Sequence, residues 1–335
     1  MKGFIYNGPG NISLQELELA KCGDNDIIIR NLCAGICGSD ITAYKHGGDA
    51  VRIFKGFEFG HEMVSEVVEV GKNVEGLKVG DRVYPYPMTC KDDRTRSATV
   101  GGFSEYVHVP NCRLNVSVFK VDDCISNRAA AMIEPFTVGG HAAKISNPGP
   151  GKNAVVFGAG IIGMAAAITL KHMGCEKIML VNRSTYRLEK AAALGFETCS
   201  PVKEDFKTKA IEVFGPAFGV MGQCPNVDIY IDATGAADVL DTFVQCAKLN
   251  AILTIPGVHH EPRTINLIPI IYGSLKIQGS GGYDFDDVNR ALEIMRSGNF
   301  DIDSLVSHAY PLEQLEEAIK KASISSESEK VIIEY

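Results

Sequence analysis

The sequence predicts an α/β protein of two domains, one built on a doubly wound parallel sheet and the other β-rich and barrel-like. From Met1 to about Pro110, short β-branched runs alternate with glycine turns. From Asn153 to Arg187, a strand pattern, a glycine turn, a helix pattern and a second strand pattern follow in order. Strand and helix patterns then continue to alternate, as in a parallel sheet. A chain of 335 residues is long enough for two separate cores.

The β-rich domain is expected to span residues 1–134 and to be completed by residues 285–335. Its predicted strands are separated by turn residues, a spacing typical of antiparallel barrel-like folds. They are Ile27 to Arg30, Val64 to Val70, Arg82 to Tyr86 and Phe103 to Val109. A helix is predicted from Ser126 to Ile145, and the turn cluster after it leads into the second domain, residues 135–284.

The second domain begins with a predicted dinucleotide site. A buried strand ends at Phe157, and Gly158, Gly160 and Gly163 follow it, with Ile161 and Ile162 opening a helix. The first glycine allows a tight bend, the second lets the backbone approach a pyrophosphate, and the third lets the helix pack on the strand. The helix N-terminus offers free amide donors to the phosphates. We therefore expect a dinucleotide to bind here.

Two alternatives for this stretch are weaker. The segment Asn153 to Leu170 carries no charge and approaches the length of a membrane span, about 20 apolar residues. Three early glycines and a polar strand end favour a buried strand and helix instead. A structural turn that binds no phosphate is the remaining alternative.

Later elements continue the parallel sheet. Strands are predicted at Val227 to Ile231 and Ile252 to Ile255, so the segment Asp232 to Gly235, which contains Thr234, falls at a strand end. Ligands of open parallel sheets bind at the carboxyl ends of the strands. Two amphipathic helices follow, one with Val288 and one with Leu315, and a terminal strand is expected to return to the first domain.

Composition excludes some partners. Lys and Arg total 33 against 41 for Asp and Glu, and the net charge of −8 argues against nucleic acid and anionic membranes as partners. The first fifteen residues have no continuous apolar core, so a cytoplasmic location is expected. Ten scattered cysteines contain no Cys-x-x-Cys pair, which favours a reducing compartment. Most are expected to be small buried residues: Cys22, Cys112, Cys124, Cys199 and Cys246.

A second set of residues indicates a metal site in the β-rich domain. Cys37 begins the run Cys-Gly-Ser-Asp, and the run Gly-His-Glu ends with His61 and Glu62. Thiolate, imidazole and carboxylate are zinc ligand types, and a catalytic zinc keeps one position open. Glu134 follows an apolar run, where a lone carboxylate would be costly. Taken singly, each is better explained by an ordinary role as a core thiol, an interior histidine, a solvated strand acid or a helix N-terminal acid, and only their joint occurrence favours a metal site.

Together these motifs resemble the zinc-dependent medium-chain dehydrogenase/reductases of the alcohol dehydrogenase superfamily, and most closely the polyol or sorbitol-type enzymes. The resemblance extends over nearly the whole chain. It implies a Rossmann domain, a GroES-like catalytic domain, and a small-molecule alcohol substrate. It rests on the motifs Cys37-Gly38-Ser39-Asp40, Gly60-His61-Glu62, Val79-Gly80-Asp81-Arg82-Val83, Gly101-Gly102-Phe103-Ser104-Glu105-Tyr106, Glu134-Pro135 and the glycine triplet.

The resemblance also implies roles for single residues. Cys37 and His61 would be zinc ligands, and Glu62 and Glu134 would bind the metal directly or through water. Ser39 would hydrogen-bond the reacting oxygen and begin a proton relay, and Glu134 would also belong to the catalytic group. The glycine triplet would hold the pyrophosphate, with Arg187 near the adenosine end.

Three departures from the family pattern change what is expected. Many relatives bind a structural zinc with four close cysteines, but between Tyr86 and Gly101 only Cys90 is present, so one zinc is expected. Thr42 replaces a relay histidine, so the proton would leave through Thr42, the ribose hydroxyl, His46 or water. Gly282 and Tyr283 stand where sorbitol-type enzymes carry an arginine-tyrosine pair, which argues against sorbitol itself.

The cofactor is expected to be NADP rather than NAD. Asn182 stands where NAD-preferring relatives have an acid, and Arg183 supplies a cation for a 2′-phosphate. The alternative is that Asn182 bonds an ordinary ribose and Arg183 is a surface charge.

The expected reaction is reversible hydride transfer between a secondary alcohol (a polyol, sugar alcohol or cyclitol) and NAD(P), in a homodimer or homotetramer. The alternatives are a metal-free NADPH-dependent quinone or enone reductase and a non-catalytic dinucleotide-binding protein.

Overall fold

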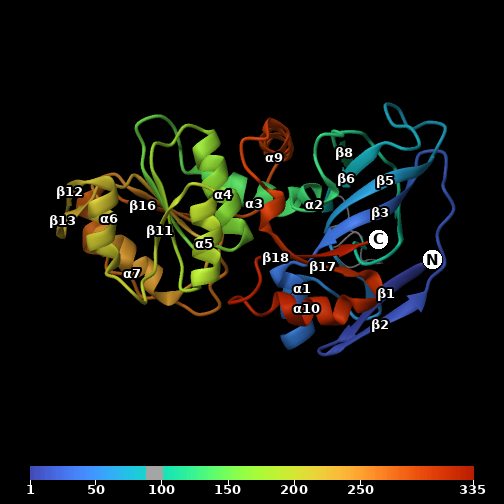
Figure 1. Cartoon of the computed structure of the whole chain (residues 1–335), viewed down its shortest axis with the longest axis horizontal. Helices are drawn as coiled ribbons and strands as arrows, with labels where there is room; N and C mark the ends of the chain where they lie inside the picture. Colours follow the sequence, from blue (N-terminus) through green and yellow to red (C-terminus); the bar gives the residue numbers. More distant parts are fainter. Residues whose placement is uncertain (88–100) are drawn as a thin grey trace. The chain divides into compact units, whose positions relative to one another are not determined.

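The computed structural model describes residues 1–87 and 101–335, and Figure 1 shows the path of the chain. Cys90 lies outside the described residues. The chain forms two compact units. Unit 1 contains residues 1–134, 295–298 and 302–335, and unit 2 contains residues 135–294 and 299–301. The predicted class, an α/β chain with a parallel-sheet domain and a β-rich domain, is confirmed. Residues 285–294, expected in the first domain, pack within unit 2.

Unit 1 is built mainly of antiparallel strands. Its larger sheet has the order β17-β18-β3-β5-β6-β8, with β7 also paired to β3, and its smaller sheet has the order β2-β1-β4. The strands are β1 (Lys2–Gly8), β2 (Asn11–Glu16), β3 (Ile27–Gly35), β4 (Phe57–Glu58), β5 (Glu62–Val70), β6 (Arg82–Pro85), β7 (Tyr106–Val109), β8 (Val118–Lys120), β17 (Val306–Pro311) and β18 (Lys330–Glu334). The last strand pairs antiparallel with β3, so the predicted return of the terminal strand is confirmed.

Among the described residues of unit 1, the α-helices are α1 (Gly38–His46), α2 (Asn127–Ala130) and α10 (Leu315–Ala322). The single helix expected from Ser126 to Ile145 is in fact two, α2 and α3 (Ile133–Ile145). The N-cap of α2 is Ser126, whose Oγ accepts a hydrogen bond from the backbone of Ala129 at 3.0 Å.

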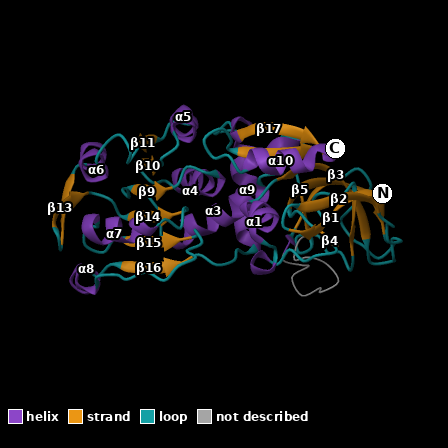
Figure 2. Ribbon diagram, turned by 90° about the horizontal axis from the view of Figure 1, so that it is seen from below, coloured by secondary structure: helices purple, strands orange, loops and turns teal. Residues whose placement is uncertain are grey.

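Unit 2 is a six-stranded parallel sheet with the order β11-β10-β9-β14-β15-β16. Figure 2 shows these strands one after another. They are β9 (Ala154–Phe157), β10 (Ile178–Val181), β11 (Glu197–Cys199), β14 (Ile229–Asp232), β15 (Ile252–Ile255) and β16 (Lys276–Gly279). The chain reverses its direction of winding between β9 and β14, which is where such sheets bind their ligands.

Helices connect the parallel strands. They are α4 (Ile161–His172), α5 (Thr185–Ala193), α6 (Phe206–Phe214), α7 (Ala237–Cys246) and α8 (Leu267–Gly273), and α9 (Phe285–Ser297) follows the last strand. A hairpin of β12 (Pro216–Gly219) and β13 (Gly222–Pro225) stands apart from the sheet. β9 and β10 are buried at every position, as parallel strands covered on both faces should be.

The described cysteines are free thiols. Cys112, Cys199 and Cys246 are buried as expected, and burial raises the pKa of Cys199 to about 11. The expectation was wrong for Cys22, which is only partly buried, and for Cys124, which is exposed because it lies in the loop before α2. In the described part of the chain, no helix combines the length and the apolar character that crossing a membrane requires.

Candidate active site

Cys37 lies where β3 ends and α1 begins. It is the N-cap residue of α1, and the carboxylate of Asp40, three residues on, accepts a hydrogen bond from the Cys37 backbone at 2.9 Å. This capping interaction satisfies a backbone donor that the helix itself leaves unpaired. The thiol is therefore presented on a defined turn just after the end of β3.

His61 and Glu62 approach the same place from the neighbouring strand. Gly60 has φ +90°, which favours glycine, and a Cβ there would lie 2.9 Å from the Phe103 ring. Glu62 opens β5, and the antiparallel register places it opposite Gly35 of β3. Strand pairing thus brings Glu62 close to Cys37, although 25 residues separate them in the chain.

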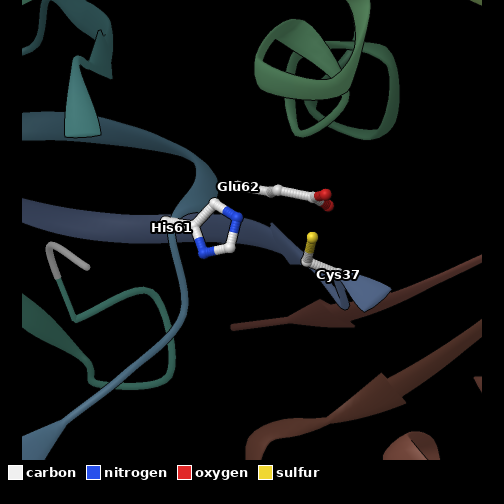
Figure 3. Close-up of side chains that lie close together, drawn as sticks. All are labelled: Cys37, His61 and Glu62. Atoms are coloured by element: carbon white, nitrogen blue, oxygen red, sulfur yellow. The ribbon is translucent and has the colours of Figure 1, made fainter. Parts of the chain in front are cut away.

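The ligand atoms of Cys37, His61 and Glu62 all lie within 4.8 Å of one another. Figure 3 shows the three side chains extending into one space. Zinc bonds of 2.0–2.3 Å require ligand atoms at about this spacing or slightly closer, so the donor set and its geometry fit zinc. The carboxylate of Glu134, in the first turn of α3, is outside this group but acts electrostatically on His61.

The cluster is surrounded by acidic side chains. Burial alone would lower the pKa of His61, but the effects of the Cys37 side chain and of the carboxylates of Glu134 and Asp40 outweigh it. The pKa of His61 is therefore raised well above its ordinary value. Burial raises the pKa of Asp40 to about 6, against the opposing effect of His61. Such an excess of negative charge suits a divalent cation.

Several polar atoms around the cluster are buried and have no hydrogen-bond partner among the described residues. They are Ser39 Oγ, His61 Nδ1 and one carboxylate oxygen of Asp40. Buried polar atoms are normally paired, so these atoms indicate a site built for further ligands. The hydroxyl of Thr42 instead donates to the Gly38 carbonyl at 2.9 Å, which leaves its oxygen able only to accept.

The glycine turn of unit 2 has the geometry expected for pyrophosphate. Gly158 has φ +99°, and Gly160 is the N-cap of α4. A Cβ at Gly163 would lie 1.9 Å from the Gly158 carbonyl oxygen, so only glycine fits there. A Cβ on Gly160 would lie 3.0 Å from the guanidinium of Arg187. The predicted phosphate-binding glycines and one cation therefore lie together, at the N-terminus of α4.

The remaining predicted cofactor residues lie at the carboxyl ends of neighbouring strands. A Cβ on Gly158 would approach the Thr234 methyl group to 2.9 Å, which places Thr234 beside the glycine turn. Asp232 holds this loop by accepting hydrogen bonds from the backbone and hydroxyl of Thr234 at 2.9 and 2.6 Å. Asn182 and Arg183 follow β10, and Arg183 forms an exposed ion pair with Asp238 at 3.3 Å.

Comparison with known proteins identifies the family. The model of the alcohol dehydrogenase GroES-like domain matches residues 23–123, and that of the zinc-binding dehydrogenase matches residues 162–297. Sorbitol dehydrogenase of Mus musculus is 27% identical over 95% of this chain and 91% of its own length. L-galactonate-5-dehydrogenase of Escherichia coli (strain K12) is 28% identical over 97% and 96%. The crystal structure of 2R,3R-butanediol dehydrogenase from Bacillus subtilis is 28% identical, with a TM-score of 0.86 over 100% and 99%.

The chain belongs to the zinc-dependent alcohol dehydrogenase superfamily. The resemblance inferred from its motifs is therefore confirmed, and the protein is an oxidoreductase that uses a nicotinamide cofactor. Cys37, His61 and Glu62 all lie within the segment that matches the GroES-like model.

One residue beside the cluster of Cys37, His61 and Glu62 was not predicted from the sequence of this dehydrogenase. Lys330, the first residue of β18, is 1% exposed, and its Nζ donates to the Ile36 carbonyl at 3.0 Å and to a carboxylate oxygen of Glu62. Burial alone would lower the pKa of Lys330, but Glu62 and Cys37 raise it. A lysine at the start of an apolar strand was the available signal.

A second acidic and histidine cluster lies in unit 2 of the dehydrogenase, where the ligand atoms of His141, Asp284 and Asp287 come within 4.8 Å of one another. Here the buried carboxylate of Asp287 already forms ion pairs with two positively charged side chains. It accepts from Lys144 at 2.7 Å and Arg290 at 3.1 Å, and from His141 at 2.7 Å. This cluster is an ion-pair network that joins α3 to α9.

Proposed function

We propose that this dehydrogenase oxidises a secondary hydroxyl group of a polyol, sugar alcohol or cyclitol to a ketone, and catalyses the reverse reduction. One zinc ion would be held by Cys37, His61 and one or both of Glu62 and Glu134. The observation that carries the proposal is the convergence of a thiol, an imidazole and a carboxylate within 4.8 Å. The relatives named above are dehydrogenases of sorbitol, L-galactonate and butanediol, compounds that all carry secondary hydroxyl groups.

When bound, zinc would supply a Lewis acid that makes a hydroxyl group easier to deprotonate near neutral pH. In the oxidation, the substrate carbon gives its hydride to the nicotinamide and its hydroxyl gives up a proton. The products are a ketone and the reduced cofactor. The protein supplies position and charge, and the cofactor carries the electrons.

Ser39 is the proposed first acceptor of the proton. Its hydroxyl oxygen is buried and has no hydrogen-bond partner among the described residues, so it is available both to accept from a substrate hydroxyl and to donate onward. Thr42 is a poorer second member of the proton relay, because its hydroxyl group already donates its proton to the Gly38 carbonyl. The cofactor ribose, His46 or water would then complete the relay.

Sorbitol is not the proposed substrate. Gly282 and Tyr283 occupy the positions at which sorbitol-type relatives carry an arginine and a tyrosine. Gly282 has no side chain, and its φ of +82° belongs to the loop that precedes α9. A different polyol, a sugar alcohol other than sorbitol, or a cyclitol is therefore favoured.

NADP is the proposed cofactor. The guanidinium of Arg183 is 72% exposed and its partner Asp238 is 64% exposed, so their ion pair is weak and Arg183 can exchange it for a 2′-phosphate. Asn182 brings no negative charge that would repel that phosphate. The change Asn182→Asp should shift kcat/KM from NADP toward NAD, and an unchanged ratio would reject the assignment.

A second copy of the chain is proposed to pair along β16. This strand ends the six-stranded sheet, so one of its edges has no neighbouring strand among the described residues. Exposed apolar side chains of the preceding helix accompany it, an arrangement typical of protein interfaces. They are Leu267, Ile268, Ile271 and Tyr272, exposed by 56–75%. Light scattering of the Ile271→Lys variant tests this, and the proposal predicts monomers.

The decisive experiment measures zinc and turnover together. Polyols, sugar acids and cyclitols are assayed with NAD and with NADP on protein of measured zinc content. The change Cys37→Ala should remove zinc and alcohol oxidation but leave cofactor binding near that of the wild type. Cys124→Ala, which removes an exposed thiol of the same unit, is the matched control. Full turnover by the zinc-free variant would contradict the proposal.

The free thiols also support a cytoplasmic location, which fractionation would test.

A further inference from the structure

We propose that Lys330 is a positioning residue that occupies one carboxylate oxygen of Glu62 and so limits Glu62 to a single contact with the metal. This inference rests on the proposed zinc site. Its consequence is that one coordination position stays available for the substrate.

The first support is the burial of the lysine. Lys330 is 1% exposed and Glu62 is 1% exposed, so neither charge is solvated by water. Lysine is almost never fully buried unless it is paired. The Nζ atom donates to the Ile36 carbonyl at 3.0 Å and to Oε2 of Glu62. The backbone carbonyl fixes the ammonium group, and the ammonium group then fixes Oε2.

The second support is the space that Gly35 provides. A Cβ at this position would lie 2.3 Å from Oε2 of Glu62 and 2.7 Å from Cε of Lys330. Gly35 is not among the residues with positive φ, so its backbone conformation does not require glycine. The requirement comes from the lysine and the carboxylate, which meet in the volume that a larger residue would fill.

The third support is charge. A thiolate and two carboxylates around a divalent cation leave one negative charge in excess, and Lys330 supplies a buried positive charge next to it. The ammonium group pairs directly with the carboxylate of Glu62, and both side chains are buried. Buried charges require such compensation.

The chemical consequence concerns the number of ligands. A carboxylate offers two oxygens and can bind a metal through both. Oε2 already accepts a hydrogen bond from the ammonium group of Lys330, so Oε1 is the oxygen that remains to bind the metal. A catalytic zinc needs three protein ligands and one open position. Lys330 thereby keeps Glu62 from taking that position.

The test compares Lys330→Met with the wild-type dehydrogenase, in the zinc form and in the cobalt form. We expect the variant to bind zinc at least as tightly, because Glu62 gains a free oxygen. Its kcat should fall roughly 10–100-fold, the range seen when partners of metal ligands are changed. The visible absorption of the cobalt form should weaken, since Co²⁺ with more than four ligands absorbs less than tetrahedral Co²⁺.

Two further variants separate this role from a structural one. Lys330→Arg retains the charge and should keep the cobalt spectrum nearer to that of the wild type. Gly35→Ala keeps every charge but fills the space between the two side chains, so it should alter the spectrum even if Lys330→Met does not fold. Lys320→Met, which removes an exposed lysine of the same unit, is the control.

The outcomes are distinct. An unchanged cobalt spectrum in Lys330→Met and Gly35→Ala, or a zinc affinity that falls together with kcat, would overturn the role of Lys330. Failure of the wild-type protein to bind zinc in a manner that depends on Cys37 would instead overturn the zinc site itself.

Discussion

Replacing Asp287 by Asn should destabilise unit 2 strongly. Its carboxylate, 1% exposed, accepts from Lys144 at 2.7 Å, His141 at 2.7 Å and Arg290 at 3.1 Å, and also from the backbone of Asp284 at 3.0 Å. An amide removes the negative charge and presents a donor to groups that are themselves donors. Breaking a buried pair in this way costs about 3–5 kcal/mol.

That cost can be expressed as a melting temperature. The entropy of unfolding is about 2.1 cal/mol/K per residue. Dividing the loss of stability by this entropy for a unit of about 160 residues predicts that the melting temperature falls by roughly 9–15 °C. Differential scanning calorimetry measures the shift, with Asp286→Asn as the control because Asp286 is an exposed acid on the same helix. The control should stay within about 0.5 kcal/mol of the wild type.

The same experiment distinguishes an ion-pair network from a metal site. Because Lys144 and Arg290 already compensate Asp287, EDTA should leave the difference between variant and wild type unchanged. A shift of less than about 2 °C, well below the range expected for a broken buried pair, or a difference that disappears when EDTA removes metal, would refute this reasoning.

Three other predictions concern the cofactor turn, the proton relay and pH. Gly163→Ala should lose at least tenfold in NAD(P)H affinity, measured by fluorescence, because its Cβ would lie 1.9 Å from the Gly158 carbonyl oxygen; normal affinity would contradict this. Ser39→Ala should lower kcat by about 10²–10⁴-fold at unchanged zinc content, and wild-type turnover would exclude Ser39 from the relay. Burial would raise the pKa of Asp284, but Lys144 and the backbone of Asp287 lower it from 3.8 to about 2. This carboxylate therefore stabilises the fold above about pH 4, and an acid titration of wild type against Asp284→Asn should show the contribution disappearing between pH 4 and 2.

Secondary structure was predictable where local pattern and tertiary environment agree. β9 and β15 were predicted residue for residue or nearly so, because short apolar runs flanked by turn residues suit buried parallel strands. α1 was missed because only Asp40 and Ala43 are buried in it, so no apolar stripe marks a helix. β16 was missed for a related reason, since its residues are mostly exposed at the edge of the sheet.

The geometry of the glycine turn was more predictable than the grouping of Cys37, His61 and Glu62, because its glycines are close in sequence. Gly158 and Gly163 act within one turn, so their spacing alone indicates their contact. Cys37 and Glu62 were recognised by residue type, and their proximity depends on strand pairing. Lys330 and Glu62 are 268 residues apart, and no local pattern relates them.

Strand register explains how the cluster of unit 1 is assembled. In the pairing of β3 with β5, Asn31 stands opposite Ser65 and Cys33 stands opposite Val64. The chain therefore advances two residues in β3 but one in β5, and Leu32 is an extra residue in β3. A second shift, between Ile28 opposite Glu69 and Ile29 opposite Val67, makes Val68 an extra residue in β5. The two shifts offset each other, so Gly35 faces Glu62 in the register with which the pairing begins at Ile27 and Val70, and Gly35 leaves the space in which Lys330 meets the carboxylate. If only the shift in β5 were present, Ala34 would stand opposite Glu62, so the pairing of the two strands decides which residue borders the proposed metal ligand, and sequence periodicity cannot reveal it.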